Sequence, residues 1–328
     1  MGQSVGQQSD AEPGKAGPAA APHHDDVFDE VGAKLNEFGD AAKHLVADID
    51  KRAGRNLPAA TVVAIAILLA IGASLIWWPW GMVVLVCLAV IGGELELYRA
   101  LRDQQAVHLV FWPLAIGSVI LVVGVYGWHF WPGGITPAWW LVGVAGLTMV
   151  VVLAVRLAGP IQGYLQDVAT SALVLVYLPI FASTLLFVLA EPRGSARLAT
   201  LVLAVTGSDT GGYFAGLAMG RHPMSPKISP KKSWEGVVGA YALSMVVTAL
   251  MTAFLLKAPW WYGVILSGVI VTCAILGDLV ESIIKRDLGV KDMGSILAGH
   301  GGFLDRIDSY LLAAVPGWLA MTLLLPHA

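Results

Sequence analysis

The stretch PWWYGVILSGVIVTCAILGDLVESIIKR (residues 259–286) determines the fold class of this chain. It contains no charged residue before Asp278, and two tryptophans, Trp260 and Trp261, lie at its start. A run of about 20 apolar residues can cross the hydrocarbon core of a bilayer as a helix, and tryptophan is enriched where such helices meet the headgroups. The stretch therefore predicts a membrane-spanning helix over residues 259–278 that ends at a charged segment.

The composition extends this interpretation to the whole chain. Hydrophobic residues make up 57% of the 328 residues and charged residues 13%, whereas a typical soluble domain has about 25% charged residues. So little charge excludes an ordinary water-soluble protein with a single core. Cys87 and Cys273 both lie in apolar runs, which predicts buried thiols and neither a disulfide framework nor a zinc site.

We expect an all-α, polytopic membrane protein with about nine spanning helices. The predicted ranges are 57–77, 79–93, 110–130, 137–155, 168–190, 198–219, 236–256, 259–278 and 303–325. The second range is short, and acidic residues interrupt the sixth and the ninth. We divide the spans into an N-terminal group over residues 57–200 and a catalytic region with cytosolic loops over residues 201–328.

Two segments precede the spans. Residues 1–25 are rich in Pro, Gly, Ala and Gln and show no apolar period, which predicts a disordered tail without a cleaved signal peptide. Residues 26–56 predict an amphipathic cytosolic helix, because Phe28, Leu35 and Leu45 recur at helical spacing. The other face of this helix is acidic, unlike that of a helix that binds anionic lipid. We therefore expect it to dock on the enzyme itself or on a second copy in a homodimer.

Positive charge alternates between the predicted loops. Lys and Arg gather before the first span and after the second, fourth, sixth and eighth, and the other loops hold few of them. Because cytosolic loops carry the excess of Lys and Arg, the amino terminus and the two most basic loops are predicted to face the cytosol. The expected location is the cell membrane, crossed several times.

Acidic residues interrupt the apolar pattern in the last third of the chain. Asp209 lies within the sixth predicted span, Asp278 ends the eighth, and Asp305 and Asp308 begin the ninth. A carboxylate at the bilayer centre costs at least about 2.5–3.5 kcal/mol on insertion scales. One such acid would fit a structural contact with a neighbouring helix, whereas acids on three spans favour one shared polar site.

Clustered carboxylates repel one another and so require a cation. Oxygen ligands without a set of His or Cys favour Mg²⁺ over zinc, and His300 alone does not make a zinc site. We predict Asp278 and Asp305 as the first Mg²⁺ ligands, followed by Asp308 and Asp209, with room for a second cation. Proteins commonly hold Mg²⁺ with one or two carboxylates and the substrate's phosphates, so phosphate chemistry is indicated.

Two loops are candidates for phosphate binding. Residues 220–236 combine cations, hydroxyls and prolines, which is more than a loop needs to set topology alone. The second loop ends in His300, Gly301 and Gly302 before a predicted helix, where backbone N–H groups can approach an anion. A topology-setting basic loop and a plain glycine turn are the structural alternatives.

The residues of these loops resemble those of the phosphatidate cytidylyltransferase family. The segments that carry the resemblance are Asp209-Thr210 with Tyr213, Ser229-Pro230-Lys231-Lys232-Ser233-Trp234-Glu235-Gly236, Ser282-Ile283-Ile284-Lys285-Arg286, Lys291-Asp292, and His300-Gly301-Gly302-Phe303-Leu304-Asp305-Arg306-Ile307-Asp308. The other spans agree with the family only in being hydrophobic, and the acidic N-terminal extension lies outside the family core.

The resemblance implies that the phosphate of phosphatidic acid attacks the α-phosphorus of CTP, which forms CDP-diacylglycerol and expels pyrophosphate. No protein nucleophile is needed, so catalysis consists of positioning and charge neutralisation. For this reaction we assign catalytic roles to Asp209, Lys232, Ser282, Lys285, Arg286, His300 and Arg306. We assign substrate binding to Lys227, Ser229, Lys231, Ser233, Lys291, Gly301 and Gly302.

Two other functions share parts of this pattern. A CTP-dependent lipid kinase, or a cytidylyltransferase for another lipid, would have the same acids and basic loops, and product analysis distinguishes these enzymes. A cation-coupled transporter also places acids within the membrane, but transporters often have two similar halves, whereas these motifs lie in the last third. The expected partners are CTP, phosphatidic acid and membrane lipids, and no nucleic acid.

Overall fold

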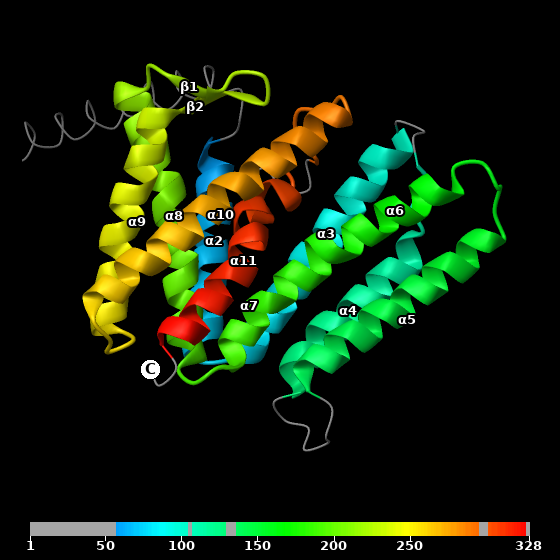
Figure 1. Cartoon of the computed structure of the whole chain (residues 1–328), viewed down its shortest axis with the longest axis horizontal. Coiled ribbons are helices and arrows are strands. Elements are labelled where there is room, and N and C mark those ends of the chain that lie inside the picture. The colour runs from blue at the N-terminus through cyan, green and yellow to red at the C-terminus, as the bar shows by residue number, and fades with distance from the viewer. Residues whose placement is uncertain (1–56, 104–106, 129–135, 295–300, 326–328) are drawn as a thin grey trace, which may run out of the picture. The chain divides into compact units, whose positions relative to one another are not determined.

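The computed structural model describes residues 57–103, 107–128, 136–294 and 301–325, with side chains from residue 65 onward. The predicted disordered tail (1–25), the predicted amphipathic helix (26–56) and His300 lie outside the described residues. From Pro58 onward the chain forms one compact unit. The described part of this unit is mostly helical, as predicted (Figure 1).

The helices follow the predicted apolar ranges in order. In the first half they are α2 (Leu57–Ile76), α3 (Pro79–Asp103), α4 (Phe111–Gly127), α5 (Pro137–Leu157), α6 (Tyr164–Leu175) and α7 (Phe181–Ala190). In the second half they are α8 (Gly194–Met219), α9 (Trp234–Phe254), α10 (Trp260–Asp287) and α11 (Leu304–Leu324). Both α3 and α10 continue by roughly two and a half to three turns beyond their predicted ends, so their charged segments are helical.

Six helical segments among the described residues are long and apolar enough to cross a membrane. They are α3, α5, the continuous run Tyr164–Ala190, α9, α10 and α11. Two shorter apolar segments, Ile65–Ile76 and Phe111–Gly127, lie below that length, and α8 is not among the six. The structure thus supports a membrane protein with six candidate spans, where the sequence predicts about nine.

The fifth predicted span is not one regular α-helix. Between α6 and α7, the segment η2 (Val176–Ile180) forms a π-helical turn that contains Pro179. Proline has no N–H to donate and its ring crowds the preceding turn, so a local change from α-helical bonding is expected there. The hydroxyl of Ser183 donates to the Pro179 carbonyl (2.6 Å). Single π-helical turns are frequent at functional sites.

The loop between α8 and α9 contains a small sheet that was not predicted. Strand β1 (Pro223–Ser225) pairs antiparallel with β2 (Ser229–Ser233), so the fold is not purely α-helical. Glu235, at the start of α9, holds this hairpin. Its carboxylate accepts the backbone N–H groups of Arg221 (3.1 Å) and His222 (3.3 Å) and lies 2.6 Å from the His222 ring.

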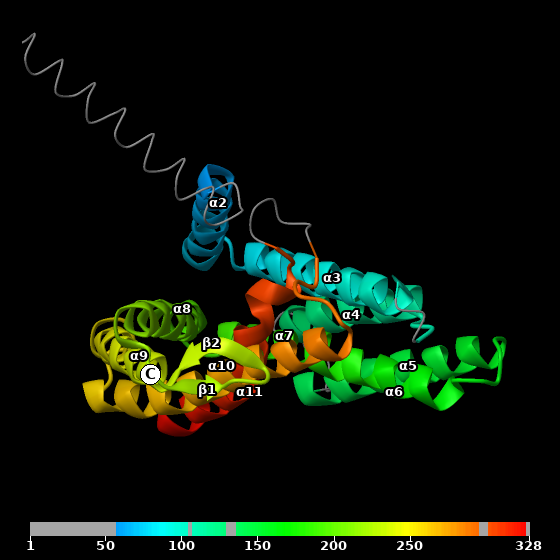
Figure 2. The ribbon, with the colours of Figure 1, turned by 90° about the horizontal axis from the view of Figure 1, so that it is seen from above.

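Helices α8 and α9 pack closely because small residues face one another. A Cβ atom on Gly211 would lie 2.3 Å from the Gly239 carbonyl oxygen, and one on Gly239 would lie 2.2 Å from the Ala215 Cβ. Small residues let the backbones of membrane helices approach in this way. The two helices run side by side (Figures 1 and 2), and α8 carries Asp209.

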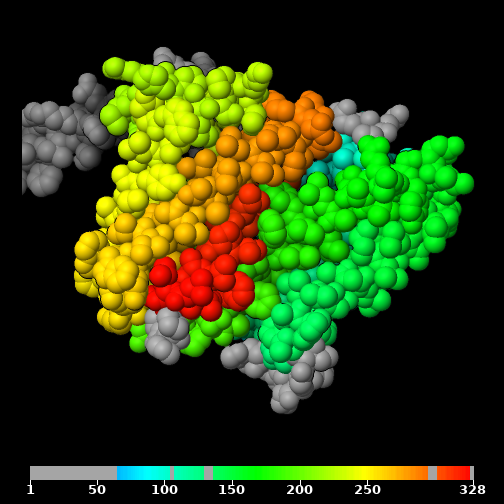
Figure 3. Space-filling model, viewed as in Figure 1, coloured from blue at the N-terminus to red at the C-terminus, as the bar shows by residue number. Residues whose placement is uncertain are grey.

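Helices α10 and α11 also approach at a glycine. A Cβ atom on Gly277 would lie 2.5 Å from the Asp308 carbonyl oxygen and 3.1 Å from the Ser309 Cα. In the space-filling view, α11 lies at the surface between α10 and the α6–α7 run (Figure 3). The contact at Gly277 directly precedes Asp278, so it determines how acids from the two helices meet.

A buried ion pair connects the last turn of α5 to the first turn of α6. Arg156 donates through Nε to Asp167 Oδ2 (2.5 Å) and through its other nitrogens to the carbonyls of Pro160 (2.7 Å) and Gln162 (3.2 Å). Asp167 also accepts the backbone N–H of His108 (2.9 Å). Arg156, which directly follows the fourth predicted span, therefore has a structural role.

Candidate functional site

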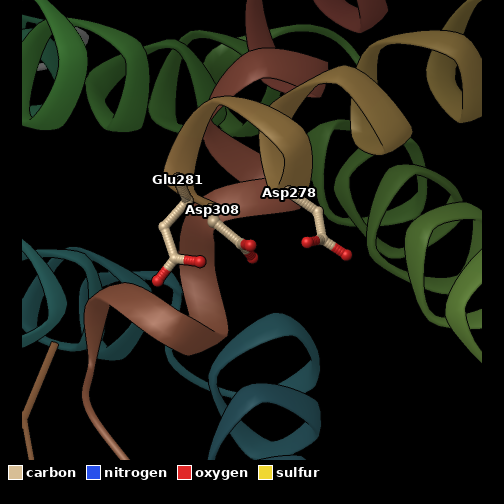
Figure 4. Close-up of side chains that lie close together, drawn as sticks. All are labelled: Asp278, Glu281 and Asp308. Carbon is tan, nitrogen blue, oxygen red and sulfur yellow. The ribbon is translucent and has the colours of Figure 1, made fainter. Parts of the chain in front are cut away.

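Three carboxylates from two helices meet in the last third of the chain. Asp278 and Glu281 belong to α10 and Asp308 to α11, and one ligand oxygen of each lies within 4.8 Å of the others. Figure 4 shows the Asp308 side chain between the two acids of α10. Glu281 and Asp308 are buried and Asp278 is half-buried. We call these three residues the acid cluster.

Asp305 is not one of the three acids of this cluster, but its carboxylate lies next to that of Glu281. Its carboxylate accepts from Lys285 Nζ (3.2 Å) and from the backbone N–H groups of Met293 (3.4 Å) and Gly302 (2.9 Å). The sequence predicts Asp278, Asp305 and Asp308 as metal ligands, and the structure brings Asp278 and Asp308 together with Glu281. Glu281 lies three residues after Asp278, a spacing that places both on one helix face, and this signal could have identified it.

Two lysines pair with the acids of the site. Lys232 Nζ, from β2, lies 2.5 Å from Asp278 Oδ2. Lys285 forms an ion pair with Glu281 and lies 3.2 Å from Asp305 Oδ1. Lys285 is a residue of α10 itself, whereas Lys232 comes from the hairpin. Lys232 thus brings the basic loop predicted over residues 220–236 to the acids of α10.

Other predicted residues lie around this centre. Ser282 donates to Asp278 Oδ1 (3.4 Å). Asp209 is exposed on α8, and the charges that act on it are those of Asp278, Lys232 and Arg306. Ser233 caps α9 by accepting the Gly236 N–H (3.1 Å).

The remaining predicted substrate-binding and catalytic residues divide by exposure. Ser229 is half-buried in β2. The exposed residues are Lys227, Lys231, Arg286, Lys291 and Arg306. Lys232 and Lys285, in contrast, are partly buried and pair with carboxylates.

The glycine turn before α11 binds protein carboxylates. Gly301 has φ +83°, a left-handed conformation that favours glycine. The N–H of Gly302 donates to Asp305 (2.9 Å), and those of Phe303 (2.9 Å) and Leu304 (3.0 Å) donate to Glu96 of α3. From the sequence we predict that these N–H groups approach a substrate anion; in the structure, two side chains occupy them.

A buried tyrosine beside the acid cluster was not predicted. Tyr177, on the π-helical turn η2, is 5% exposed, and its hydroxyl has no hydrogen-bond partner among the described residues. The acids that act on it electrostatically are Asp308, Glu281 and Asp278. Buried polar groups normally have partners, so this unpaired hydroxyl is unusual. A tyrosine within an apolar run reads as a core residue, which is why the sequence carries no signal for it.

The model of the cytidylyltransferase family matches residues 58–324. The chain belongs to this family. Membership makes it an enzyme, a nucleotidyltransferase. The matched range includes the acid cluster, both basic loops and the helices of the first half. Similarity to the cytidylyltransferase family therefore extends well beyond the motifs in residues 209–308.

Several similar proteins are named phosphatidate cytidylyltransferase. The one from Mycobacterium leprae (strain TN) is 40% identical over 313 residues, which cover 90% of this chain and 97% of that protein. The one from Mycobacterium tuberculosis (strain ATCC 25618 / H37Rv) is 39% identical over 296 residues, covering 86% and 88% respectively. That of Haemophilus influenzae is 44% identical over 134 residues, covering 38% and 44%.

Proposed function

We propose that this chain is a phosphatidate cytidylyltransferase, which makes CDP-diacylglycerol and pyrophosphate from CTP and phosphatidic acid. The observation that carries the proposal is its 40% identity to the Mycobacterium leprae protein of that name over 97% of that protein. The site supports it, because acids and cations meet at one end of apolar helices. A lipid phosphate can reach such a place from the bilayer and a nucleotide from water.

In the proposed reaction, an oxygen of the phosphatidate phosphate forms a bond to the α-phosphorus of CTP. The bond from that phosphorus to the bridging oxygen of the pyrophosphate group breaks, and its electron pair leaves with pyrophosphate. Lys232 and Lys285 supply positive charge beside the reacting phosphates. The exposed Lys227, Lys231 and Lys291 attract the nucleotide to the site.

The experiment that tests this function is product analysis with purified full-length protein, CTP, Mg²⁺ and phosphatidic acid. We expect CDP-diacylglycerol and pyrophosphate in equal amounts. A phosphorylated lipid together with CDP would instead identify a CTP-dependent lipid kinase and contradict the proposal. Omitting phosphatidic acid is the control, and pyrophosphate should then not accumulate.

Mg²⁺ fits the acid cluster. The three carboxylates lie close enough to share one ion, and Glu281 Oε1 is buried without a hydrogen-bond partner among the described residues. Carboxylate oxygens are the ligands that Mg²⁺ prefers. We propose that Asp278, Glu281 and Asp308 hold the ion, which when bound neutralises charge on the phosphates. Asp305 then orients Lys285, and Asp209 is a candidate ligand for a second cation.

The metal proposal predicts that Asp278→Asn lowers kcat by more than about 100-fold, because loss of even an outer partner of a metal ligand typically costs about 10- to 100-fold. Activity should be measured across a Mg²⁺ titration. Asp287→Asn is the matched control, since it removes one exposed carboxylate from the same helix, and it should behave as wild type. Near-normal activity of Asp278→Asn at every Mg²⁺ concentration would exclude this residue as a ligand.

We propose that the Tyr177 hydroxyl donates a hydrogen bond to a substrate phosphate, and Tyr177→Phe tests this role. A hydrogen bond to a charged group contributes about 1.5–3 kcal/mol, so kcat/KM for phosphatidic acid or CTP should fall by roughly 10- to 100-fold. Without substrate, the protein should be more stable, because an unpaired buried hydroxyl costs about 1–3 kcal/mol. Thermal unfolding measures that difference.

Ser267→Ala is the control for Tyr177→Phe. The Ser267 hydroxyl is also buried without a partner among the described residues, and it lies about three helical turns before Asp278 on α10. This variant should gain stability and keep full activity. Full activity in Tyr177→Phe as well would show that its hydroxyl does not contact substrate.

We propose further that about nine helices cross the plasma membrane and that the amino terminus and the site face the cytosol. The alternation of positive charge supports this orientation, and CTP is a polyanion that does not cross membranes. Ser225→Cys and Val290→Cys, each in a Cys87→Ala/Cys273→Ala background, should react with an impermeant thiol reagent only from the cytosolic side. Labelling of the two positions from opposite sides would contradict a shared site.

A further inference from the structure

Glu96 of α3 reaches the first turn of α11, 207 residues later in the chain. Its Oε1 accepts the N–H of Phe303 (2.9 Å) and its Oε2 that of Leu304 (3.0 Å). The side chain is 1% exposed. A buried carboxylate is very costly without partners, and the N–H groups at the positive end of a helix are favourable partners for it. The contact therefore joins α3 firmly to the start of α11.

Glycines make room for this carboxylate. A Cβ atom on Gly302 would lie 2.4 Å from Glu96 Oε2, and one on Gly294 would lie 2.5 Å from Glu96 Oε1. About one turn earlier on α3, a Cβ atom on Gly92 would lie 2.5 Å from the Phe303 ring. Backbone and side chain thus enclose Glu96 closely, and the start of α11 has little freedom to shift along α3.

The same turn of α11 leads directly to the acid cluster. The N–H next to those bound by Glu96 belongs to Gly302 and donates to Asp305, which contacts Lys285. One turn further along α11 is Asp308. A displacement of this turn would therefore change both the Asp305–Lys285 contact and the place of Asp308 opposite α10.

We propose that Glu96 is a positioning residue for this reaction, which fixes the start of α11 so that Asp305 and Asp308 keep their places. The proposal rests on the proposed function. Glu96 acts through the backbone of Phe303 and Leu304 and occupies N–H groups that would otherwise be free to bind an anion. Helix α3, far in sequence from the acids of the site, thereby contributes to catalysis.

Glu94 offers a matched control on the same helix. It is 0% exposed, and its Oε1 accepts from the Ser118 hydroxyl of α4 (2.5 Å). Glu94→Gln therefore changes a buried acid of α3 that faces α4, whereas Glu96→Gln changes one that faces α11. If the loss of any buried carboxylate from α3 lowers stability or activity, both variants should show that loss.

The experiment combines steady-state kinetics with amide hydrogen exchange on the full-length protein. In Glu96→Gln, the side chain keeps its shape but has one acceptor oxygen for two N–H groups. We expect kcat to fall about 10- to 100-fold, the range for loss of an outer partner, while KM for CTP changes less than about twofold. Exchange should accelerate in the peptide that contains Phe303 and Leu304. Glu94→Gln should keep wild-type kcat and wild-type exchange in that peptide.

The following results would decide whether Glu96 has this positioning role. Wild-type kcat in Glu96→Gln, unchanged exchange at the start of α11, or equal losses in both variants would overturn it. If the wild-type protein makes no CDP-diacylglycerol, the proposed function fails whatever the exchange data show. If the wild-type protein makes it and Glu96→Gln makes it equally fast, the positioning role alone fails.

Discussion

The close contact of α10 with α11 at Gly277 is the constraint on which the site depends. A side chain there would collide with the Asp308 carbonyl, so the contact requires glycine. The next residue, Asp278, belongs to the acid cluster, and so does Asp308 across the contact. This close approach of the two backbones is therefore at the place where acids of both helices meet. In a membrane, where apolar burial does not drive helices together, close contact of this kind holds them.

Charged side chains join further segments to this pair of helices. Lys232 connects the hairpin to Asp278, and Lys285 connects the end of α10 to Asp305. Glu96 attaches α3 to the backbone at the start of α11. Carboxylates are costly in an apolar surrounding, and each of these contacts offsets that cost with a partner from a different segment. The interactions that stabilise the acids are thus the ones that assemble the site.

The apolar runs of the sequence, and the charged residues that interrupt them, predict much of the fold and of the site. The positions of the helices follow from the length of those runs, and acids within three of them indicate the site. The hairpin was not predicted, because the short pairing of β1 with β2 depends on contacts of Glu235 with Arg221 and His222. Helical spacing places Asp305 with Asp308, but at the first turn its carboxylate binds the Gly302 N–H instead. The contact of Glu96 could not be predicted from the sequence, because only tertiary packing brings this residue to residues 303 and 304.

The rate of CDP-diacylglycerol formation by Gly277→Ala, compared with Gly268→Ala, tests the central role of the α10–α11 contact most directly. Both variants add one methyl group to α10, but a Cβ atom on Gly268 has no atom within 4 Å, whereas one on Gly277 would lie 2.5 Å from the Asp308 carbonyl oxygen. Alanine also favours helix over glycine by about 1 kcal/mol, so helix propensity does not oppose either change. We predict that Gly268→Ala keeps wild-type kcat and that Gly277→Ala loses at least about tenfold, the effect of roughly 1.4 kcal/mol on the barrier. Wild-type kcat in a folded Gly277→Ala protein would contradict the account.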